Sequence, residues 1–245
     1  MTVGLVPLIR GLVSNMASIA LGERLLPETG RKQNEGKRWG RSVDLVMTRL
    51  FDICASLALL MFLAPLMIVV AALIVITNPG PVIFGHKRLG RDGRTFHCLK
   101  FRSMVTDSQE RLAQLLATDA EARREWERDH KLKNDPRITP IGAFLRKSSL
   151  DELPQLFNVL RGDMSLVGPR PIVMDEVRRY GRYFSHYSQV RPGITGLWQI
   201  SGRNNTTYRR RVALDVAYSR SRSLALNLKI LFMTVPSVLL AKGSY

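Results

Sequence analysis

The chain has 245 residues, enough for one large domain or for a domain with appendages, and its 37 lysines and arginines outnumber its 20 acids to give a net charge of +17. An excess of this size predicts an anionic partner: nucleic acid, an acidic membrane surface or a phosphate-rich substrate. The two cysteines (Cys54 and Cys98) and the four histidines have no metal-ligand spacing, which argues against a disulfide framework and against a structural metal site.

The first segment in chain order, residues 1–45, is predicted to be a poorly ordered, basic lead-in. Residues 28–41 are rich in Gly, Lys, Arg and Asn, a composition typical of segments that do not fold alone. The sequence assigns no function to this segment.

A membrane segment is predicted for residues 46–80, because residues 53–77 contain no charged side chain. A helix over those residues would extend about 37 Å, longer than the roughly 30 Å of a bilayer's hydrocarbon core. Pro65 lies at the middle of this run, and proline kinks a helix by removing a backbone hydrogen bond. Basic residues flank the run on both sides, and basic flanks favour the cytoplasmic side. Two topologies stay open: a helix that crosses the membrane, and a re-entrant helix whose two ends face the cytoplasm.

The remainder, residues 81–245, is predicted to form a compact cytoplasmic domain. Two short strands, residues 82–84 and 95–101, are expected to form a β-hairpin around Asp92-Gly93. The elements expected after the hairpin are a charged helix (106–133), a break (134–136), a short helix (156–160), a mixed helix (175–187), a Gly/Pro-rich loop (191–203) and an apolar tail helix at the membrane interface (224–240).

Two adjacent acids, Asp151 and Glu152, are the first candidates for catalysis. They precede Pro154 and the helical run 156–160, so they are expected near a helix N-terminus. One interpretation is structural, with Ser149 and Glu152 forming a capping box. The other is chemical, because the partial positive charge of a helix N-terminus attracts phosphate and keeps an aspartate ionised and nucleophilic. The two acids taken alone favour the structural interpretation.

Four basic residues are candidates for holding phosphate. Arg170 lies in Gly-Pro-Arg-Pro and Arg191 precedes Pro-Gly-Ile-Thr-Gly, so prolines stiffen both loops. Lys100 and Arg102 belong to the strand after the hairpin turn. Arginine can bind two phosphate oxygens at once, and phosphoryl transfer needs a nucleophile, a divalent cation and basic residues around the phosphate. Anionic-substrate chemistry beside a membrane accounts for the four together.

Four ordered motifs carry a family resemblance. They are Lys100-Phe-Arg-Ser-Met, the segment from Leu145 to Leu160 that contains Ser-Ser-Leu-Asp-Glu-Leu-Pro, the segment Gly162-Asp-Met-Ser-Leu-Val-Gly-Pro-Arg-Pro, and Arg191-Pro-Gly-Ile-Thr-Gly-Leu-Trp. Together they resemble the bacterial sugar transferase family, the monotopic polyprenyl-phosphate phosphoglycosyl transferases, in the short form that initiates exopolysaccharide. The resemblance covers about residues 47–240.

The resemblance implies a fold and a reaction. The implied fold is a helix-rich, membrane-associated α/β protein: one re-entrant membrane helix kinked at Pro65, and a compact cytoplasmic domain with a small β-hairpin and interfacial amphipathic helices. The implied reaction transfers a sugar-1-phosphate from a UDP-sugar to undecaprenyl phosphate, releases UMP and initiates exopolysaccharide or a related glycan. The implied place is the cytoplasmic face of a bacterial inner membrane, in contact with anionic lipids. A homo-oligomer is left open.

The resemblance also implies roles for the candidate residues. Asp151 matches the nucleophile, which would form a covalent aspartyl-phosphosugar. Glu152 matches the acid that helps hold Mg²⁺, while Arg170 and Lys100 match cations close to the phosphate. One position departs from the family pattern: Asn227 stands where members often carry aspartate, so its contribution to a site is in doubt.

Two other functions compete with this interpretation. The net charge of +17 would also suit a membrane-anchored nucleic-acid-binding protein. However, aromatic residues make up only 7% of the chain and no nucleic-acid-binding motif is present, so nucleic acid is not expected as a partner. The second alternative is a non-catalytic scaffold for polysaccharide assembly, which the presence of Asp151, Glu152 and Arg170 disfavours.

Overall fold

The computed structural model describes residues 33–129, 132–201 and 207–239, and these residues form two compact units. The first unit holds residues 33–62, 85–98 and the described residues from 155 onward. The second unit holds residues 63–84 and the described part of 99–154. Most of the predicted lead-in, residues 1–32, lies outside the described residues.

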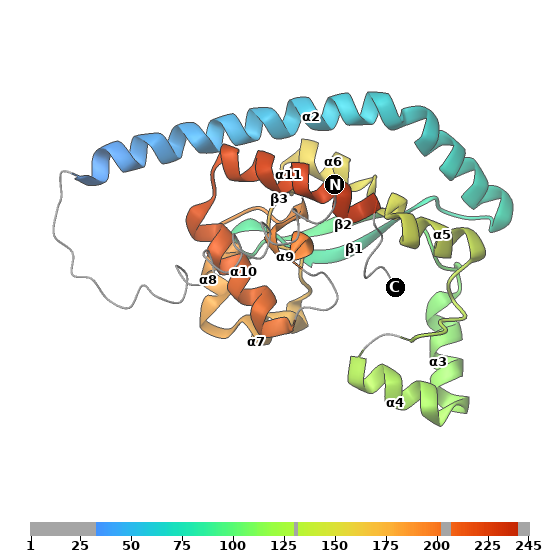
Figure 1. Ribbon diagram of the computed structural model, residues 1–245. Helices are drawn as coiled ribbons and strands as arrows, with labels where there is room; N and C mark the ends of the chain where they lie inside the picture. The colour runs from blue at the N-terminus through green and yellow to red at the C-terminus, as the bar shows by residue number, and fades with distance from the viewer. Residues whose placement is uncertain (1–32, 130–131, 202–206, 240–245) are drawn as a thin grey trace. The chain divides into compact units, whose positions relative to one another are not determined.

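Helix α2 (Gln33–Thr77) is the longest element and contributes to both units (Figure 1). It begins at Gln33, so the last part of the predicted lead-in is helical, and it continues through Pro65. The part from Ser42 to Thr77 is long and apolar enough to cross a membrane, judged by length and composition, and most of it is not covered by other described residues. The choice between a spanning and a re-entrant helix stays a prediction.

Strands β1 (Ile83–Leu89) and β2 (Thr95–Phe101) form the predicted β-hairpin. In the turn between them, Asp92 (φ 57°) and Gly93 (φ 71°) both adopt the left-handed backbone conformation that Asp and Gly tolerate best. β1 extends beyond the predicted end at Phe84. The sequence underestimates it because most side chains of a two-stranded ribbon stay exposed, which leaves no alternating apolar pattern.

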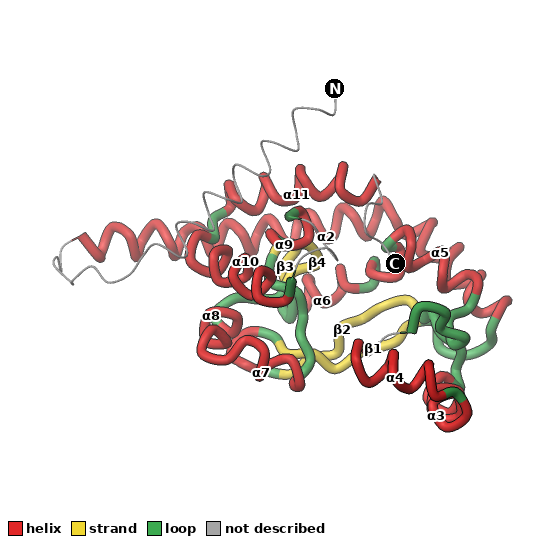
Figure 2. Tube along the Cα trace, turned by 60° about the horizontal axis from the view of Figure 1, so that its bottom comes forward, coloured by secondary structure: helices red, strands yellow, loops and turns green. Residues whose placement is uncertain are grey.

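A second sheet lies in the first unit and is parallel. Strands β3 (Ser165–Val167) and β4 (Gly193–Thr195) pair with Ser165 opposite Gly193, beside helices α9 (Leu197–Ile200) and α11 (Leu224–Leu239) (Figure 2). The prediction of a loop over 191–203 is therefore wrong at β4 and α9. A Cβ atom on Gly193 would lie 2.0 Å from the backbone nitrogen of Gly168, so glycine serves here for close backbone approach.

Short helices complete the first unit. The predicted helix over 175–187 is wrong as one element: two 3-10 turns alternate with two short helices, and Gly181 interrupts them with φ 51°. The predicted tail helix is confirmed as α11. It buries Ile230 and Met233 and exposes Phe232 and Val235, so it is amphipathic. The remaining elements of this unit are α6 (Gln155–Arg161), η3 (Met174–Glu176), α7 (Val177–Tyr180), η4 (Gly181–Tyr183), α8 (Phe184–Ser188) and α10 (Tyr208–Ser221).

The second unit contains α3 (Ser108–Thr118), α4 (Ala120–Asp129) and α5 (Pro140–Ser148). The sequence predicts one helix over 106–133, and the structure divides it at Asp119. The carboxylate of Asp119 accepts hydrogen bonds from the backbone N–H groups of Glu121 (2.8 Å) and Ala122 (3.0 Å), which starts a new helix there.

Each unit has its own apolar core. In the first unit Phe51, Ala55 and Leu60 of α2 pack against residues of α6, β3, α9, α10 and α11. In the second unit Val70 and Ile74 of α2 pack against β2 and α5. The architecture is therefore a helix-rich α/β fold with one long apolar helix and a small β-hairpin, as predicted.

Candidate active site

The two candidate acids lie on a 3-10 turn, η2 (Leu150–Glu152), between α5 and α6. Ser149 ends α5 in the left-handed conformation (φ 60°), and its side chain caps no backbone N–H of the turn. The predicted capping box between Ser149 and Glu152 is therefore wrong. The acids also do not begin helix α6, which starts at Gln155. A left-handed non-glycine residue costs about 1 kcal/mol, so packing of α5 must hold this turn in place.

Lys100 of β2 joins the two acids. Its Nζ lies 3.3 Å from Asp151 Oδ2 and 2.7 Å from Glu152 Oε1, so the two carboxylates converge on one positive charge. The side chain of Asp151 is 9% exposed, whereas those of Glu152 and Lys100 are 34% and 33% exposed. Asp151 is therefore mostly buried, and its two charged neighbours are partly exposed.

The surroundings of Asp151 shift the pKa of its carboxyl group. Removal from water raises the pKa of its carboxyl group, and the negative Glu152 acts in the same direction. The positive charge of Lys100 opposes both, and that of Arg146 adds a smaller lowering. The sequence predicted that a helix N-terminus would keep Asp151 ionised. In the structure two cations favour the ionised form instead, against the cost of burial.

Arg146 also belongs to this site, although the sequence did not single it out as a candidate. Its Nε donates a 2.8 Å hydrogen bond to Ser103 Oγ, and burial lowers the pKa of its guanidinium while the charge of Asp151 raises it. Helix α5 packs closely against the segment that follows β2. A Cβ atom on Gly142 of α5 would lie only 2.0 Å from the carbonyl oxygen of Ser103. In the sequence, only its place as the second residue of the motif that begins at Leu145 could have identified Arg146.

Arg102 occupies a different place from the acid pair. It is buried, and its guanidinium donates to the backbone carbonyls of Asn78 and Pro79 in the turn after α2. Its backbone N–H donates to Val82 O at 2.8 Å. No contact between Arg102 and either acid is present among the described residues, and a phosphate-binding role for it stays a prediction.

Arg170 lies in the first unit, in a group of arginines and aromatic rings. Its Cζ is 6.0 Å from the centroid of the Trp198 ring, and that of Arg211 is 4.2 Å from the same ring. Within the described residues, Trp198 Nε1 and Arg211 Nε are buried without a hydrogen-bond partner. Burial lowers the pKa of Arg211, and the positive charge of Arg170 lowers it further. Like charges gathered around buried, unpaired N–H groups are suited to an anion.

Arg191 also lies in the first unit, but its contacts differ from those of Arg170. Its Nε donates to the carbonyl oxygen of Gly162 at 2.8 Å, and it lines a cavity together with Arg49. The predicted site residues thus lie in four places: Lys100 with Asp151 and Glu152, Arg102 at the turn after α2, Arg170 with Arg211 and Trp198, and Arg191 at the cavity. Asn227 accepts a 2.9 Å hydrogen bond from Tyr218 OH and lines the same cavity as Arg191.

The acid pair is suited to a divalent cation. Two adjacent carboxylates already share one cation, the ammonium group of Lys100. Magnesium in phosphoryl-transfer sites is usually held by one or two carboxylates together with substrate phosphates. The described residues contain no cluster of three or more acidic, His or Cys side chains that could hold a metal alone. The residues present therefore fit an ion that arrives with a phosphorylated substrate.

Comparison with known proteins gives a consistent result. A family model described as "Bacterial sugar transferase" matches residues 43–241. The chain is 49% identical over 247 residues to "Undecaprenyl-phosphate galactose phosphotransferase" of Salmonella typhimurium, an alignment that covers 100% of this chain and 50% of the relative. It is 55% identical over 201 residues to an "Uncharacterized sugar transferase" of Haemophilus influenzae, covering 82% of this chain and 42% of that relative.

A shorter relative matches over most of its own length. The chain is 46% identical over 205 residues to "Exopolysaccharide production protein ExoY" of Rhizobium meliloti, which covers 84% of this chain and 91% of the relative. By contrast, the chain spans about half the length of the galactose phosphotransferase and 42% of the Haemophilus protein.

Proposed function

Because the chain belongs to the bacterial sugar transferase family, we propose that it transfers a sugar-1-phosphate from a UDP-sugar to undecaprenyl phosphate and releases UMP. The product would be the first lipid-linked sugar of an exopolysaccharide or related glycan, as the likeness to the Rhizobium exopolysaccharide protein suggests. The observation that carries the proposal is the convergence of Asp151 and Glu152 on Lys100.

In the first step Asp151 acts as the nucleophile. A carboxylate oxygen of Asp151 attacks the phosphorus atom that carries the sugar, and the bond from that phosphorus to the bridging oxygen of UMP breaks. UMP leaves with the electron pair of that bond. The raised pKa of Asp151 makes its carboxylate more basic than an exposed one, and the positive charge of Lys100 favours the ionised form. The result is an aspartyl-phosphosugar.

In the second step an oxygen of undecaprenyl phosphate attacks the same phosphorus. The bond between Asp151 and phosphorus breaks, the carboxylate is restored, and the product is a polyprenyl-diphosphate sugar. Splitting one displacement into two through a covalent carboxylate intermediate is a common route in phosphoryl transfer. Lys100 can stay beside Asp151 in both steps and balance the carboxylate charge each time it reappears.

Glu152 would hold Mg²⁺ together with substrate phosphate oxygens, and the ion would supply neutralisation of the charge that develops on the leaving phosphate. The resemblance gives Arg170 a phosphate-binding role, and its group with Arg211 in the first unit is suited to an anion. Glu152 takes no part in the bond changes.

Helix α2 supports a membrane location. Its apolar, largely uncovered part from Ser42 to Thr77 has basic residues on both sides, which suits a re-entrant helix kinked at Pro65 with both ends in the cytoplasm. The enzyme would then act at the cytoplasmic face of the inner membrane, beside anionic lipids. Tags at the two termini should be equally accessible from the cytoplasm, whereas opposite accessibility would indicate a spanning helix.

Asp151→Asn tests the nucleophile directly. Membranes with wild-type protein, a UDP-sugar, Mg²⁺ and undecaprenyl phosphate should release UMP, and we expect the variant to lose at least about 10⁴-fold in rate, because asparagine cannot form the intermediate. Mass spectrometry of the protein incubated with UDP-sugar alone should show a phosphosugar adduct on wild type and none on the variant. Asp92→Asn, at the exposed hairpin turn, is the matched control. UMP release by Asp151→Asn at the wild-type rate would refute the assignment. Wild-type protein that gives neither adduct nor UMP would favour a scaffold.

A further inference from the structure

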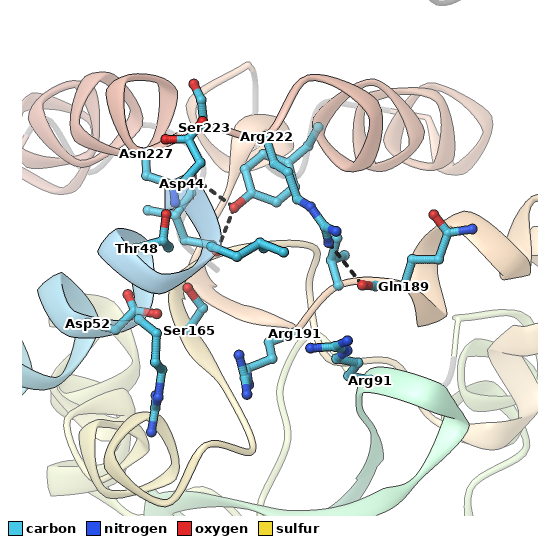
Figure 3. A pocket seen from close by; sticks show the side chains of 15 residues that line it. Asp44, Thr48, Asp52, Arg91, Ser165, Gln189, Arg191, Arg222, Ser223 and Asn227 are labelled. Carbon is cyan, nitrogen blue, oxygen red and sulfur yellow. Dashed lines mark hydrogen bonds between the residues drawn. The ribbon is translucent and has the colours of Figure 1, made fainter. Parts of the chain in front are cut away.

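The first unit contains a partly open cavity whose wall comes from several segments (Figure 3). The first half of α2 contributes Thr48, Arg49 and Asp52, whose spacing places them on one face of the helix. Arg91 of the hairpin turn and Arg191 before β4 lie across the cavity from them (Figure 3). The rest of the wall comes from β3, from the residues before Arg191 and from the connection between α10 and α11 with its flanking helix ends.

Hydrogen bonds within the unit fix the α2 side of this cavity. Arg49 donates to the carbonyl oxygens of Val159 (2.6 Å) and Leu160 (3.0 Å). Asp52 accepts from the N–H of Leu166 at 3.1 Å. Asp44, also in the wall, accepts from the N–H of Leu224 at 3.2 Å. The acidic side chains of the wall are thus already bound to backbone donors, and the cavity keeps its shape without a ligand.

The net charge of the wall is positive. Four arginines against two aspartates give a formal charge of +2: Arg49, Arg91, Arg191 and Arg222 against Asp44 and Asp52.

Two of these arginines have donors to spare. Arg191 uses its Nε for Gly162 O, and Arg91 Nε lies 3.7 Å from Asp92 Oδ2. Within the described part of the chain, the terminal nitrogens of Arg91 and Arg191 make no hydrogen bond. Burial lowers the pKa of Arg191, and the positive charges of Arg49 and Arg91 lower it further, so a bound anion would relieve this repulsion.

The position of the cavity along α2 indicates the source of the anion. The α2 residues of its wall, 44 to 52, end directly before the uncharged stretch 53–77. With that stretch in the hydrocarbon core, the cavity lies at the level of the lipid headgroups, where phosphate is concentrated.

We propose that this cavity binds the phosphate group of an anionic membrane phospholipid, held by Arg91 and Arg191. The lipid is a stabilising ligand of the first unit and is not consumed. The proposal shares with the proposed function only the insertion of α2 into a bilayer, and it does not depend on Asp151 or on any sugar transfer.

The test uses the full chain in nanodiscs of phosphatidylcholine, with and without phosphatidylglycerol. We expect phosphatidylglycerol to raise the thermal unfolding midpoint, and native mass spectrometry after extraction to show retained phosphatidylglycerol. Arg91→Gln should reduce that retention by about tenfold, as expected for loss of one charge-assisted pair of hydrogen bonds, and Arg91→Lys should restore part of it.

Arg111→Gln is the matched control, because it removes the same charge from a side chain of α3 with similar exposure, 50% against 48% for Arg91. Equal midpoints with and without phosphatidylglycerol, or unchanged retention in Arg91→Gln, would overturn the proposal. An equal shift produced by inorganic phosphate would assign the cavity to a soluble anion. Displacement of phosphatidylglycerol by undecaprenyl phosphate, with slower UMP release in Arg91→Gln, would assign it to the lipid substrate. UMP release is measured separately, so its absence would leave the retention result readable.

Discussion

Each unit contains a buried aspartate, and the two differ in their partners. Asp151 of the second unit is 6% exposed as a whole residue and shares the ammonium group of Lys100 with Glu152. Asp215 of the first unit is 2% exposed and accepts a 2.6 Å hydrogen bond from Tyr180 OH. Burial raises the pKa of both carboxyl groups, to about 7 for Asp215, where the hydrogen bond from Tyr180 and the charges of Arg211 and Arg170 oppose the rise.

The comparison shows that burial alone does not identify a reactive carboxylate. A neutral phenol, itself buried, donates its hydrogen bond to Asp215, and burial together with the negative charge of Asp215 raises the pKa of Tyr180 far above its usual range. Asp151 instead faces a partly exposed cation, Lys100, beside a second carboxylate that is suited to binding a metal. We therefore interpret Asp215 as a structural residue and Asp151 as the reactive one.

The largest effect that sharpens this comparison is expected from Lys100→Met. Removing the cation should raise the pKa of Asp151, so a smaller fraction would be ionised at neutral pH. We expect the rate of UMP release to fall by about 10²–10³-fold and the acidic limb of its pH profile to move to higher pH. The exposed Lys147 gives a control variant, Lys147→Met, with the same change in charge. An unshifted acidic limb would show that Lys100 does not set the protonation of Asp151.

A smaller effect is expected from Asp215→Asn, which should change the pH dependence of stability and not the activity. The folded pKa of about 7 lies above the usual 3.8, so the folded state binds this proton more tightly than the unfolded chain. Wild type should therefore lose stability as the pH rises from about 4 to about 7, and the loss should level off above that. Asp215→Asn should remove this part of the slope of the thermal midpoint against pH, and keep UMP release within about twofold.

Asp215→Ala extends the same test. It leaves the hydroxyl of Tyr180 without its acceptor and should cost about 1–3 kcal/mol of stability. Loss of UMP release in Asp215→Asn at an unchanged midpoint would break the distinction between the two aspartates.

The smallest effect is expected from Asn227→Asp, which adds a buried acid at the position where this chain departs from the family pattern. Asn227 Oδ1 already accepts from Tyr218 OH at 2.9 Å, and a carboxylate can accept the same bond. Arg222 lines the same cavity and offers a positive charge. We expect UMP release within about twofold of wild type and a change in stability below about 1 kcal/mol. A larger loss of activity would show that position 227 contributes to the reaction.

Long or repetitive elements could be predicted from the sequence. The uncharged stretch predicted the apolar part of α2, Asp92-Gly93 predicted the hairpin turn, and the apolar tail predicted α11. Each of these signals is contained in a local run of residues. The break at Asp119 was missed because a side-chain cap inside a charged helical pattern changes neither its composition nor its period.

Features that depend on contacts between distant residues could not be predicted. The three-residue strands β3 and β4 are too short for an alternating pattern, and Gly193 of β4, which pairs with Ser165, resembles a loop residue. The motifs supplied Asp151, Glu152 and Lys100, and the structure brings these three together. Arg211 carried no motif, and only its position over Trp198 relates it to Arg170.

Helix α2 has a practical consequence for anyone who wishes to obtain a soluble fragment. Deleting the residues before position 81 would remove the apolar segment. It would also remove core residues: Phe51, Ala55 and Leu60 from one core and Val70 and Ile74 from the other. Each large side chain lost would lower the free energy of unfolding by several kcal/mol. Purification with α2 intact, in detergent or in polymer-bounded discs, is the route that preserves both cores.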